Sequence, residues 1–169
     1  MIQQQSKVFL CLGANLGERL LTLQKTVKAL NAIDFIDVVK VSSVYETEPW
    51  GMIEQPRFLN VAAEIETVLE PLELLHELKN LERRLGRTPG MRWGPRIVDI
   101  DIILWDGLQF HTDELTIPHI YFRERHFVLA PLAEIAPEAI DPITGFTVGA
   151  LLDNLSVKAL VPCADINYS

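Results

Sequence analysis

Residues 97–105 read Ile-Val-Asp-Ile-Asp-Ile-Ile-Leu-Trp, and this run decides how the rest of the chain is interpreted. It is typical of a β-strand, because it is short and strongly apolar and only two aspartates interrupt it. Side chains alternate along a strand, so Asp99 and Asp101 would share one face, about 6–7 Å apart at their bases. The opposite face would point to a core and carry Val98, Ile100, Ile102 and Leu104.

Outward from this strand, periodicity predicts strands at 7–12, 34–47 and 57–67, and helices at 16–31 and 71–85, the second of which stops at Gly86. In the strand at 57–67, one face carries Leu59, Val61, Ala63 and Ile65. Asn15 is the expected N-cap of the first helix, with Glu18 in capping-box position. The order β-α-β-β-α-β predicts an α+β fold of the ferredoxin-like kind, an antiparallel sheet with two helices packed on one face. Extra C-terminal helices are expected at 124–135 and 148–155, and residues 156–169 as a loose tail.

Composition bounds the class of protein. A chain of 169 residues with 49% apolar residues fits a single domain over residues 1–169. A net charge of −8 argues against a nucleic-acid binder, whose surface is basic. The two cysteines, Cys11 and Cys163, form no metal or disulfide pattern, and neither a signal peptide nor a membrane span is evident. We expect a cytoplasmic monomer that engages neither nucleic acid nor membrane.

The two strand aspartates are the first chemical feature. Neighbouring carboxylates are costly when they are buried, because like charges repel and desolvation is expensive. Hard divalent cations remove that cost, and one or two carboxylates plus substrate phosphates form the usual Mg²⁺ site. Spacing alone leaves a solvent-facing acidic pair on an edge strand equally possible.

The second feature is a run of arginines that adjoins the aspartates. Arginine suits phosphate groups because its planar fork donates paired hydrogen bonds and keeps its charge. A solvated helix end explains the first two arginines of the run, but it explains those beyond the helix poorly. The window 83–98 contains no acid and carries Arg83, Arg84, Arg87, Arg92 and Arg96.

Three further features are weaker. Glu82 lies beside an apolar helix stripe, so it needs a cationic partner in the arginine loop; a buried salt bridge and a role in binding are both open. His119 could touch a phosphate, although a lone histidine is more often structural. Aromatic residues could stack on a flat heterocycle, and core packing explains each of them as well. These aromatics are Phe58, which shares a strand face with Asn60, together with Trp93 and Phe127.

Residues 92–103, Arg-Trp-Gly-Pro-Arg-Ile-Val-Asp-Ile-Asp-Ile-Ile, closely resemble the signature of the 6-hydroxymethyl-7,8-dihydropterin pyrophosphokinase family of folate biosynthesis. Supporting matches extend from about residue 7 to residue 155. They are Leu-Gly-Ala-Asn-Leu-Gly at 12–17, Ser-Ser-Val-Tyr-Glu-Thr at 42–47, Gln-Pro-Arg-Phe-Leu-Asn at 55–60, Pro-His at 118–119 and Arg-His-Phe-Val-Leu at 125–129.

The resemblance implies an ATP-dependent diphosphokinase that transfers the β,γ-diphosphate of ATP to the pterin hydroxymethyl group and releases AMP. It implies that Asp99 and Asp101 hold two Mg²⁺ ions and that loops 48–56 and 87–92 close over both substrates. The triphosphate contacts would be Arg87, Arg92, Arg96, His119 and Arg125, with Glu82, Trp93, Ile102 and Thr116 completing the ATP site. The pterin would be framed by Thr47, Phe58, Asn60, Trp93, Asp99 and Phe127.

The chain departs from some family members at three positions, which hold Phe58, Pro89 and Ile120 where those members have tyrosine, arginine and tyrosine. These departures concern single contacts and leave the metal site unaffected. The main rival is a non-catalytic ferredoxin-like ligand-binding module, which would not need an Asp-x-Asp pair beside an arginine cluster. A second rival, another phosphoryl transferase on the same fold, would release ADP instead of AMP.

Overall fold

A computed structural model describes residues 3–49, 51, 54–87, 97–156 and 159–168. The predicted β-α-β-β-α-β order is confirmed, with one strand divided into two. The strands are β1 (Ser6–Ala14), β2 (Ile36–Val41), β3 (Val44–Thr47), β4 (Phe58–Thr67), β5 (Asp99–Trp105), β6 (Phe110–His111), β7 (Thr116–Ile117) and β8 (Pro162–Ala164). The helices are α1 (Arg19–Asn31), α2 (Pro71–Arg84), the 3-10 turn η1 (Phe122–Glu124), α3 (His126–Ile135) and α4 (Val148–Asp153).

The main sheet runs β5-β1-β4-β3-β8, and β2 also pairs with β4. All of these pairings are antiparallel, as the ferredoxin-like prediction requires. The single strand predicted at 34–47 is divided because Ser42 interrupts it. The Ser42 side-chain oxygen accepts a hydrogen bond from the Ala62 amide, while the Ser42 amide donates to the Ala62 carbonyl. Ser42 alone thus binds both the amide and the carbonyl of Ala62. The chain then continues as β3, which pairs with β4 in a new register.

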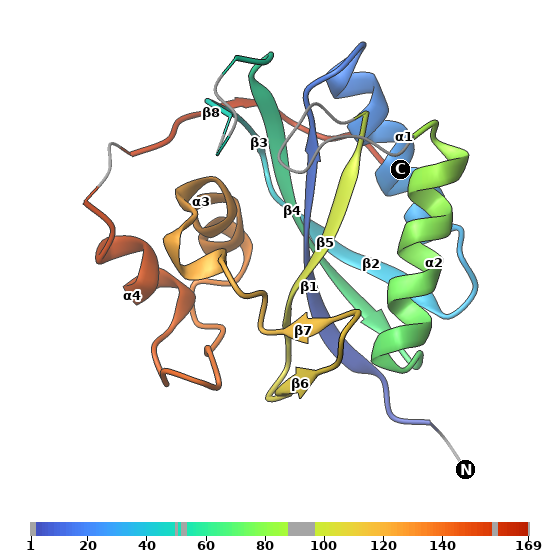
Figure 1. Cartoon of the computed structure of the whole chain (residues 1–169), viewed down its shortest axis with the longest axis vertical. Helices are drawn as coiled ribbons and strands as arrows, with labels where there is room; N and C mark the ends of the chain where they lie inside the picture. The colour runs from blue at the N-terminus through green and yellow to red at the C-terminus, as the bar shows by residue number, and fades with distance from the viewer. Residues whose placement is uncertain (1–2, 50, 52–53, 88–96, 157–158, 169) are drawn as a thin grey trace.

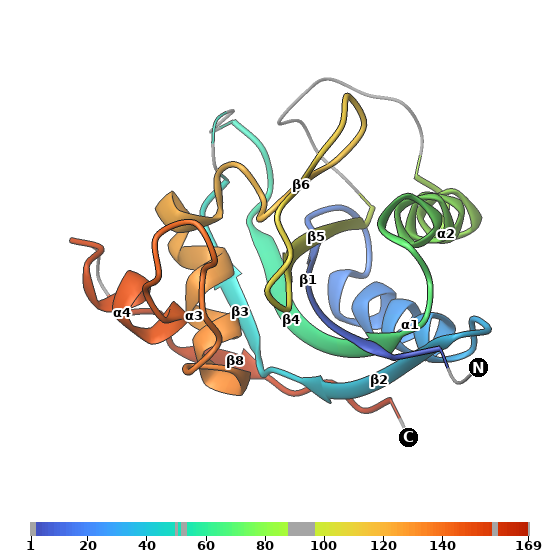
Figure 2. The same cartoon turned by 90° about the horizontal axis from the view of Figure 1, so that it is seen from below.

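Helices α1 and α2 cover one face of the sheet, and Figure 2 shows both helices on the same side of the strands. Alternate residues of β4 point to this side, as the sequence predicts: Leu59, Val61, Ala63 and Ile65 are all buried in the same cluster. Helix α2 begins with a capping box between Glu70 and Glu73. It ends before Gly86, whose φ of 98° fits the glycine stop predicted there.

Helices α3 and α4 lie on the other face, opposite α1 and α2 (Figure 1). Their core includes Leu104, which the sequence assigned to the α1–α2 side. That assignment is wrong because the β1–β5 register shifts at this point: Phe9 pairs with Leu104 and Leu10 with Ile102. Ile103 is the extra residue, so the alternation reverses after it.

Two other expectations fail at the ends of elements. Asn15 does not cap the first helix, which begins at Arg19 after Glu18; its side chain donates to Gln55 and to the Pro56 carbonyl. The C-terminal tail is not wholly irregular, since β8 pairs with β3 at the sheet edge. None of the helices in the described part of the chain has the length and apolar character that a membrane span needs.

Candidate active site

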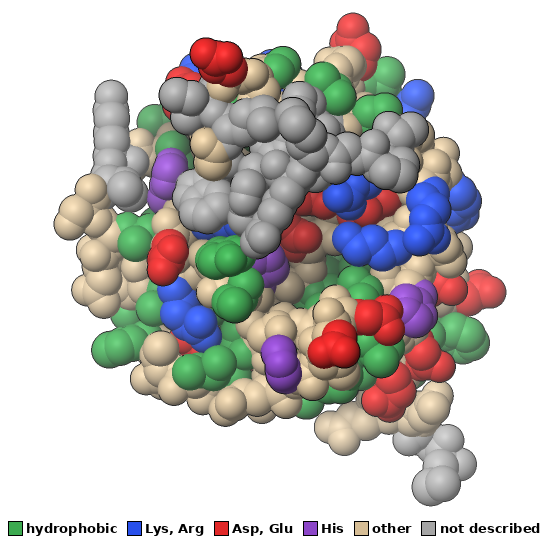
Figure 3. Space-filling view, viewed as in Figure 1, with side chains coloured by type: hydrophobic (Ala, Val, Ile, Leu, Met, Phe, Trp, Pro, Cys, Tyr) green, Lys and Arg blue, Asp and Glu red, His purple; other side chains and the backbone are tan. Residues whose placement is uncertain are grey.

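A cavity of about 300 Å³ opens on the α3 face of the sheet, at the end where the apolar cover stops. Figure 3 views this side of the molecule and shows acidic side chains in a central hollow, with Lys and Arg side chains on its right-hand rim. Residues of three neighbouring strands form its floor. They are Cys11 and Gly13 of β1, Phe58 and Asn60 of β4, and Asp99 and Asp101 of β5.

Strand register explains why these residues meet. Gly13 of β1 pairs with Asn60 on one side and with Asp99 on the other, and Cys11 pairs with Asp101. Directly paired residues of adjacent strands point to the same face of a sheet. Gly13 keeps the floor open, because a Cβ there would lie 3.2 Å from the Asn60 side-chain oxygen.

The two aspartates line one cavity, as the sequence predicts. Burial and the adjacent Asp99 carboxylate raise the pKa of Asp101 to about 7. Burial is the main cause that raises the pKa of the Cys11 thiol, and the negative charges of Asp101 and Asp99 raise it further. The thiol therefore stays protonated and is not a nucleophile. A site that resists a second negative charge is suited to a divalent cation, which would reverse this effect.

The donor set fits Mg²⁺ if a ligand completes it. Within the described residues, no cluster of three or more His, Cys, Asp or Glu side chains could hold a metal alone. Two carboxylate groups, those of Asp99 and Asp101, remain, which is the usual protein share of a magnesium site that also binds phosphate.

Glu82 and Arg87 brace the floor from the α2 side. The Glu82 carboxylate is 1% exposed, accepts the Ile100 amide at 2.8 Å and pairs with Arg87. Arg87 also reaches Asp99 at 2.9 Å. Burial acts to lower the pKa of Arg87, but Asp99 and Glu82 outweigh it and raise the pKa, so the guanidinium stays charged. The cationic partner predicted for Glu82 is thus present.

Residues 119–128 form the cavity wall on the α3 side. His119 accepts the Tyr121 amide through Nδ1, at 3.1 Å, which leaves its proton on Nε2. Burial, assisted by the nearby Arg125 charge, lowers the pKa of His119 to about 4. The ring is therefore a neutral hydrogen-bond donor near pH 7.

Arg125 forms the centre of this wall. Its side chain is buried, and its guanidinium lies 5.2 Å from the Tyr121 ring centroid and 5.6 Å from that of Phe127. Across the cavity, the Asn60 amide donates to the Thr47 hydroxyl at 2.7 Å. The cavity thus offers aromatic rings, an amide and hydroxyl pair, and cationic and anionic groups within one space.

Most of the residues singled out in the sequence meet here, while three lie elsewhere. Ile102 is buried in the core on the α1–α2 side, Thr116 bonds to His111 on the β6–β7 hairpin, and Glu82 lies behind the floor. Arg92, Trp93, Arg96 and Pro89 fall outside the described residues. Those that line the cavity are Thr47, Phe58, Asn60, Arg87, Asp99, Asp101, His119, Arg125 and Phe127.

Sequence reasoning missed several lining residues. Gly13 and Cys11 could have been found by pairing the first strand with the Asp-x-Asp strand, since their period of two places them on one face. Glu48 and Tyr121 carried no pattern of their own. Lys79 lines both this cavity and a second hollow beside Glu114, between α2 and the β6–β7 connection.

Comparisons with known proteins identify the family. Residues 9–137 match the model of the family described as 7,8-dihydro-6-hydroxymethylpterin-pyrophosphokinase. Two curated relatives are named 2-amino-4-hydroxy-6-hydroxymethyldihydropteridine pyrophosphokinase. The Bacillus subtilis protein is 46% identical over 77% of this chain and 78% of its own length. The Methylorubrum extorquens protein is 43% identical over 92% of this chain and 97% of its own.

Solved structures support the fold. The HPPK-DHPS protein of Plasmodium falciparum superposes with a TM-score of 0.72 at 16% identity, over 89% of this chain. This chain spans 45% of that longer protein, so the likeness shows the fold alone. Taken with the family match and the two bacterial relatives, it leads to one conclusion: the chain belongs to the 7,8-dihydro-6-hydroxymethylpterin-pyrophosphokinase family.

Proposed function

We propose that the cavity beside α3 is the place where this chain performs the reaction of its family. That reaction is ATP-dependent transfer of a pyrophosphoryl group to the hydroxymethyl group of 6-hydroxymethyl-7,8-dihydropterin, a step of folate biosynthesis. The chain is accordingly a transferase with two small-molecule substrates. The observation that carries the location is the meeting of Asp99 and Asp101 with Arg87, His119 and Arg125 around one cavity.

The inner part of the cavity suits the pterin. Phe58 and Phe127 present ring surfaces on which a flat heterocycle can stack, and Asn60 and Thr47 can read its edge. Asn60 is buried at 3% exposure and already oriented by Thr47, so it need not be ordered when the ligand binds. We assign these four residues to the pterin, with Trp93 as a further proposed contact outside the described residues.

The β5 side of the cavity suits the polyphosphate. Arg87 and Arg125 supply charged donors and His119 supplies a neutral one, which together would stabilise charge on the transferred group. We assign Arg92 and Arg96 to the same task, although both lie outside the described residues. The hollow shared by Lys79 and Glu114 would take the nucleoside end, with Glu82, Ile102 and Thr116 as proposed neighbours.

Asp99 and Asp101 are the proposed metal ligands, for two Mg²⁺ ions. Bound Mg²⁺ would screen the polyphosphate charge and fix the geometry of the phosphates. The protein's own part is to hold the two carboxylates at neighbouring positions of a rigid strand. Arg87 bridges Asp99 and Glu82 and so fixes the orientation of the first carboxylate.

We propose that the chain acts in the cytoplasm, since Cys11 and Cys163 are both free thiols, as a reducing compartment favours. We propose that it acts as a monomer and engages neither nucleic acid nor membrane, in keeping with its net charge of −8.

Product analysis tests the activity. The chain is incubated with ATP, Mg²⁺ and the hydroxymethyl pterin, and nucleotide products are separated. AMP and the pterin diphosphate are expected in equal amounts, and ADP as the nucleotide product would refute pyrophosphoryl transfer. Calorimetry with a non-hydrolysable ATP analogue, with and without Mg²⁺, then tests the metal assignment; Mg²⁺-independent binding would count against it.

A further inference from the structure

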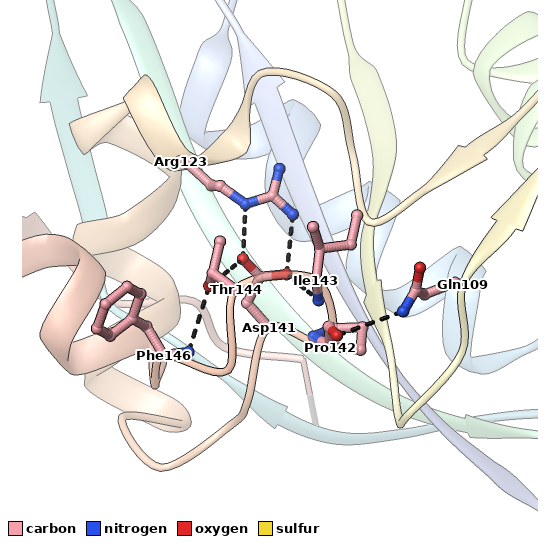
Figure 4. Close-up of polar contacts among 7 residues, drawn as sticks. All are labelled: Gln109, Arg123, Asp141, Pro142, Ile143, Thr144 and Phe146. Atoms are coloured by element: carbon pink, nitrogen blue, oxygen red, sulfur yellow. Dashed lines mark hydrogen bonds and ion pairs between the residues drawn. The ribbon is translucent and has the colours of Figure 1, made fainter.

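Asp141 lies between α3 and α4 and is fully buried, at 0% exposure, although it is charged. Figure 4 shows its carboxylate facing the Arg123 guanidinium. Arg123 donates from Nε at 2.6 Å and from Nη2 at 2.8 Å, one bond to each carboxylate oxygen. A buried carboxylate with this paired geometry is held in one orientation.

The segment around Asp141 is itself fixed. The carboxylate also accepts the Ile143 amide and the Thr144 hydroxyl, and the Asp141 backbone pairs with Phe146 and Gly145. Gln109 donates to the Pro142 carbonyl at 3.3 Å and ties this turn to the connection after β5. Asp141 is therefore a rigid anchor, and Arg123 is the group that it anchors.

Arg123 belongs to η1, which lies inside the cavity wall. Tyr121 precedes it by two residues and Arg125 follows it by two, and both line the cavity. The wall here is a single 3-10 turn, held by the buried Phe122 ring and a few backbone bonds. Such a short turn has little stability of its own, so an outside anchor decides where its side chains point.

We propose that Asp141 is a positioning residue for the cavity wall: by gripping Arg123, it orients the η1 turn that presents Arg125 and Phe127 to the substrates. This inference rests on the proposed function. Neither Asp141 nor its turn belongs to residues 9–137, over which the family model matches. The anchor thus lies beyond the segment that the family model covers.

The test compares Asp141→Asn with the wild-type chain. Asparagine keeps the size of the side chain but removes the charge, so Arg123 loses its paired bonds. We expect the KM for the pterin to rise about tenfold, since small misplacements of binding groups cost one to two orders of magnitude. The value of kcat per folded molecule should fall by a smaller factor, because Arg125 on the same turn is displaced from the transferred group but is not removed.

Arg123→Lys is the second variant and preserves the charge without the fork. It should show the same rise in pterin KM, and combining it with Asp141→Asn should add little, since both remove one contact. Thr67→Val is the matched control. Its buried hydroxyl bonds to Phe35 and Leu69 at the opposite end of β4 from Phe58, so it costs stability without reaching the wall.

The outcomes separate the two proposals. Wild-type enzyme that forms no AMP refutes the proposed function. Active wild type with an unchanged pterin KM in both Asp141→Asn and Arg123→Lys overturns the positioning role, as does an equal rise in Thr67→Val. Backbone amide NMR shifts of residues 119–128 provide a reading that needs no activity: they should move in the Asp141 and Arg123 variants and stay in place in the control.

Discussion

The two faces of the sheet differ in how completely they are covered. On the α1–α2 side, apolar residues of every central strand meet two helices, and the resulting core contains large side chains with no exposure, such as Leu10 and Leu78. On the α3 side, the apolar cluster reaches only part of the way along the strands, and polar residues continue from it.

The difference shows how a small fold makes room for chemistry. A continuous core provides the free energy of folding, roughly 25 cal/mol for each Å² of apolar surface buried. The second face can then hold groups that oppose folding, such as the adjacent Asp99 and Asp101. If this division is real, substitutions on one face should change activity with little effect on stability, and substitutions on the other face should do the reverse.

The largest expected effect is on catalysis, from Asp101→Ala. Activity should fall by at least about 10³-fold, because a charge-stabilising group is lost from the reacting centre. The free energy of unfolding should stay unchanged or rise, since the variant removes a carboxylate that is buried beside another. AMP release and urea unfolding measure the two quantities. Near-normal turnover in this variant would remove the basis of the metal assignment.

Leu78→Ala probes the opposite face. This side chain is fully buried on α2, and truncating it should cost about 2–5 kcal/mol of stability through lost burial and a residual cavity. For a chain of this size, each kcal/mol lowers Tm by roughly 2–4 °C. Turnover per folded molecule should remain normal, which calorimetry and activity assays on the same sample can decide. A selective loss of turnover would break the comparison between the two faces.

Asn60→Ala sharpens the comparison within one strand. Asn60 lies on the cavity side of β4, and its neighbours Leu59 and Val61 point to the closed core. Loss of one amide that reads the ligand should raise the pterin KM about tenfold, equivalent to about 1.4 kcal/mol. Steady-state kinetics with ATP in excess give this value. An unchanged pterin KM would place the pterin elsewhere.

Alternation and register account for what the sequence could predict. The period of two assigned both faces of β4 correctly, and the Asp-x-Asp spacing correctly put both carboxylates on one face of β5. The same rule failed at Leu104, because a one-residue bulge at Ile103 is set by pairing with Phe9 and Leu10 and leaves no local signal.

Side-chain competition explains the other differences. Asn15 has the residue type and position of a helix cap, yet its side-chain amide donates a hydrogen bond to the distant Pro56 carbonyl instead. The tail becomes a strand only because β3 offers it an edge, and no propensity within residues 162–164 indicates this. The grip of Asp141 on Arg123 joins residues 18 apart in sequence that form no motif, so only the structure could reveal it.

A pH dependence of stability is expected to arise from Asp141. Burial acts to raise its pKa, but the bonds from Arg123, Thr144 and the Ile143 amide outweigh it, so the folded-state pKa lies below the ordinary 3.8. Between these two values the unfolded chain binds more protons than the folded one, so stability falls as the pH falls. The contribution is therefore complete above pH 5 and is lost as acid titrates the folded carboxylate.

Urea unfolding of the wild type and Asp141→Asn from pH 7 to pH 2.5 measures this contribution. Their free energies of unfolding should differ by about 2 kcal/mol at neutral pH, which is typical of hydrogen bonds to a charged group. The two free energies should converge at the acid end of this range. A difference that persists unchanged at pH 2.5 would mean that the variant acts through packing. Convergence would instead show that the α3–α4 side is held partly by the charge of the Asp141 carboxylate.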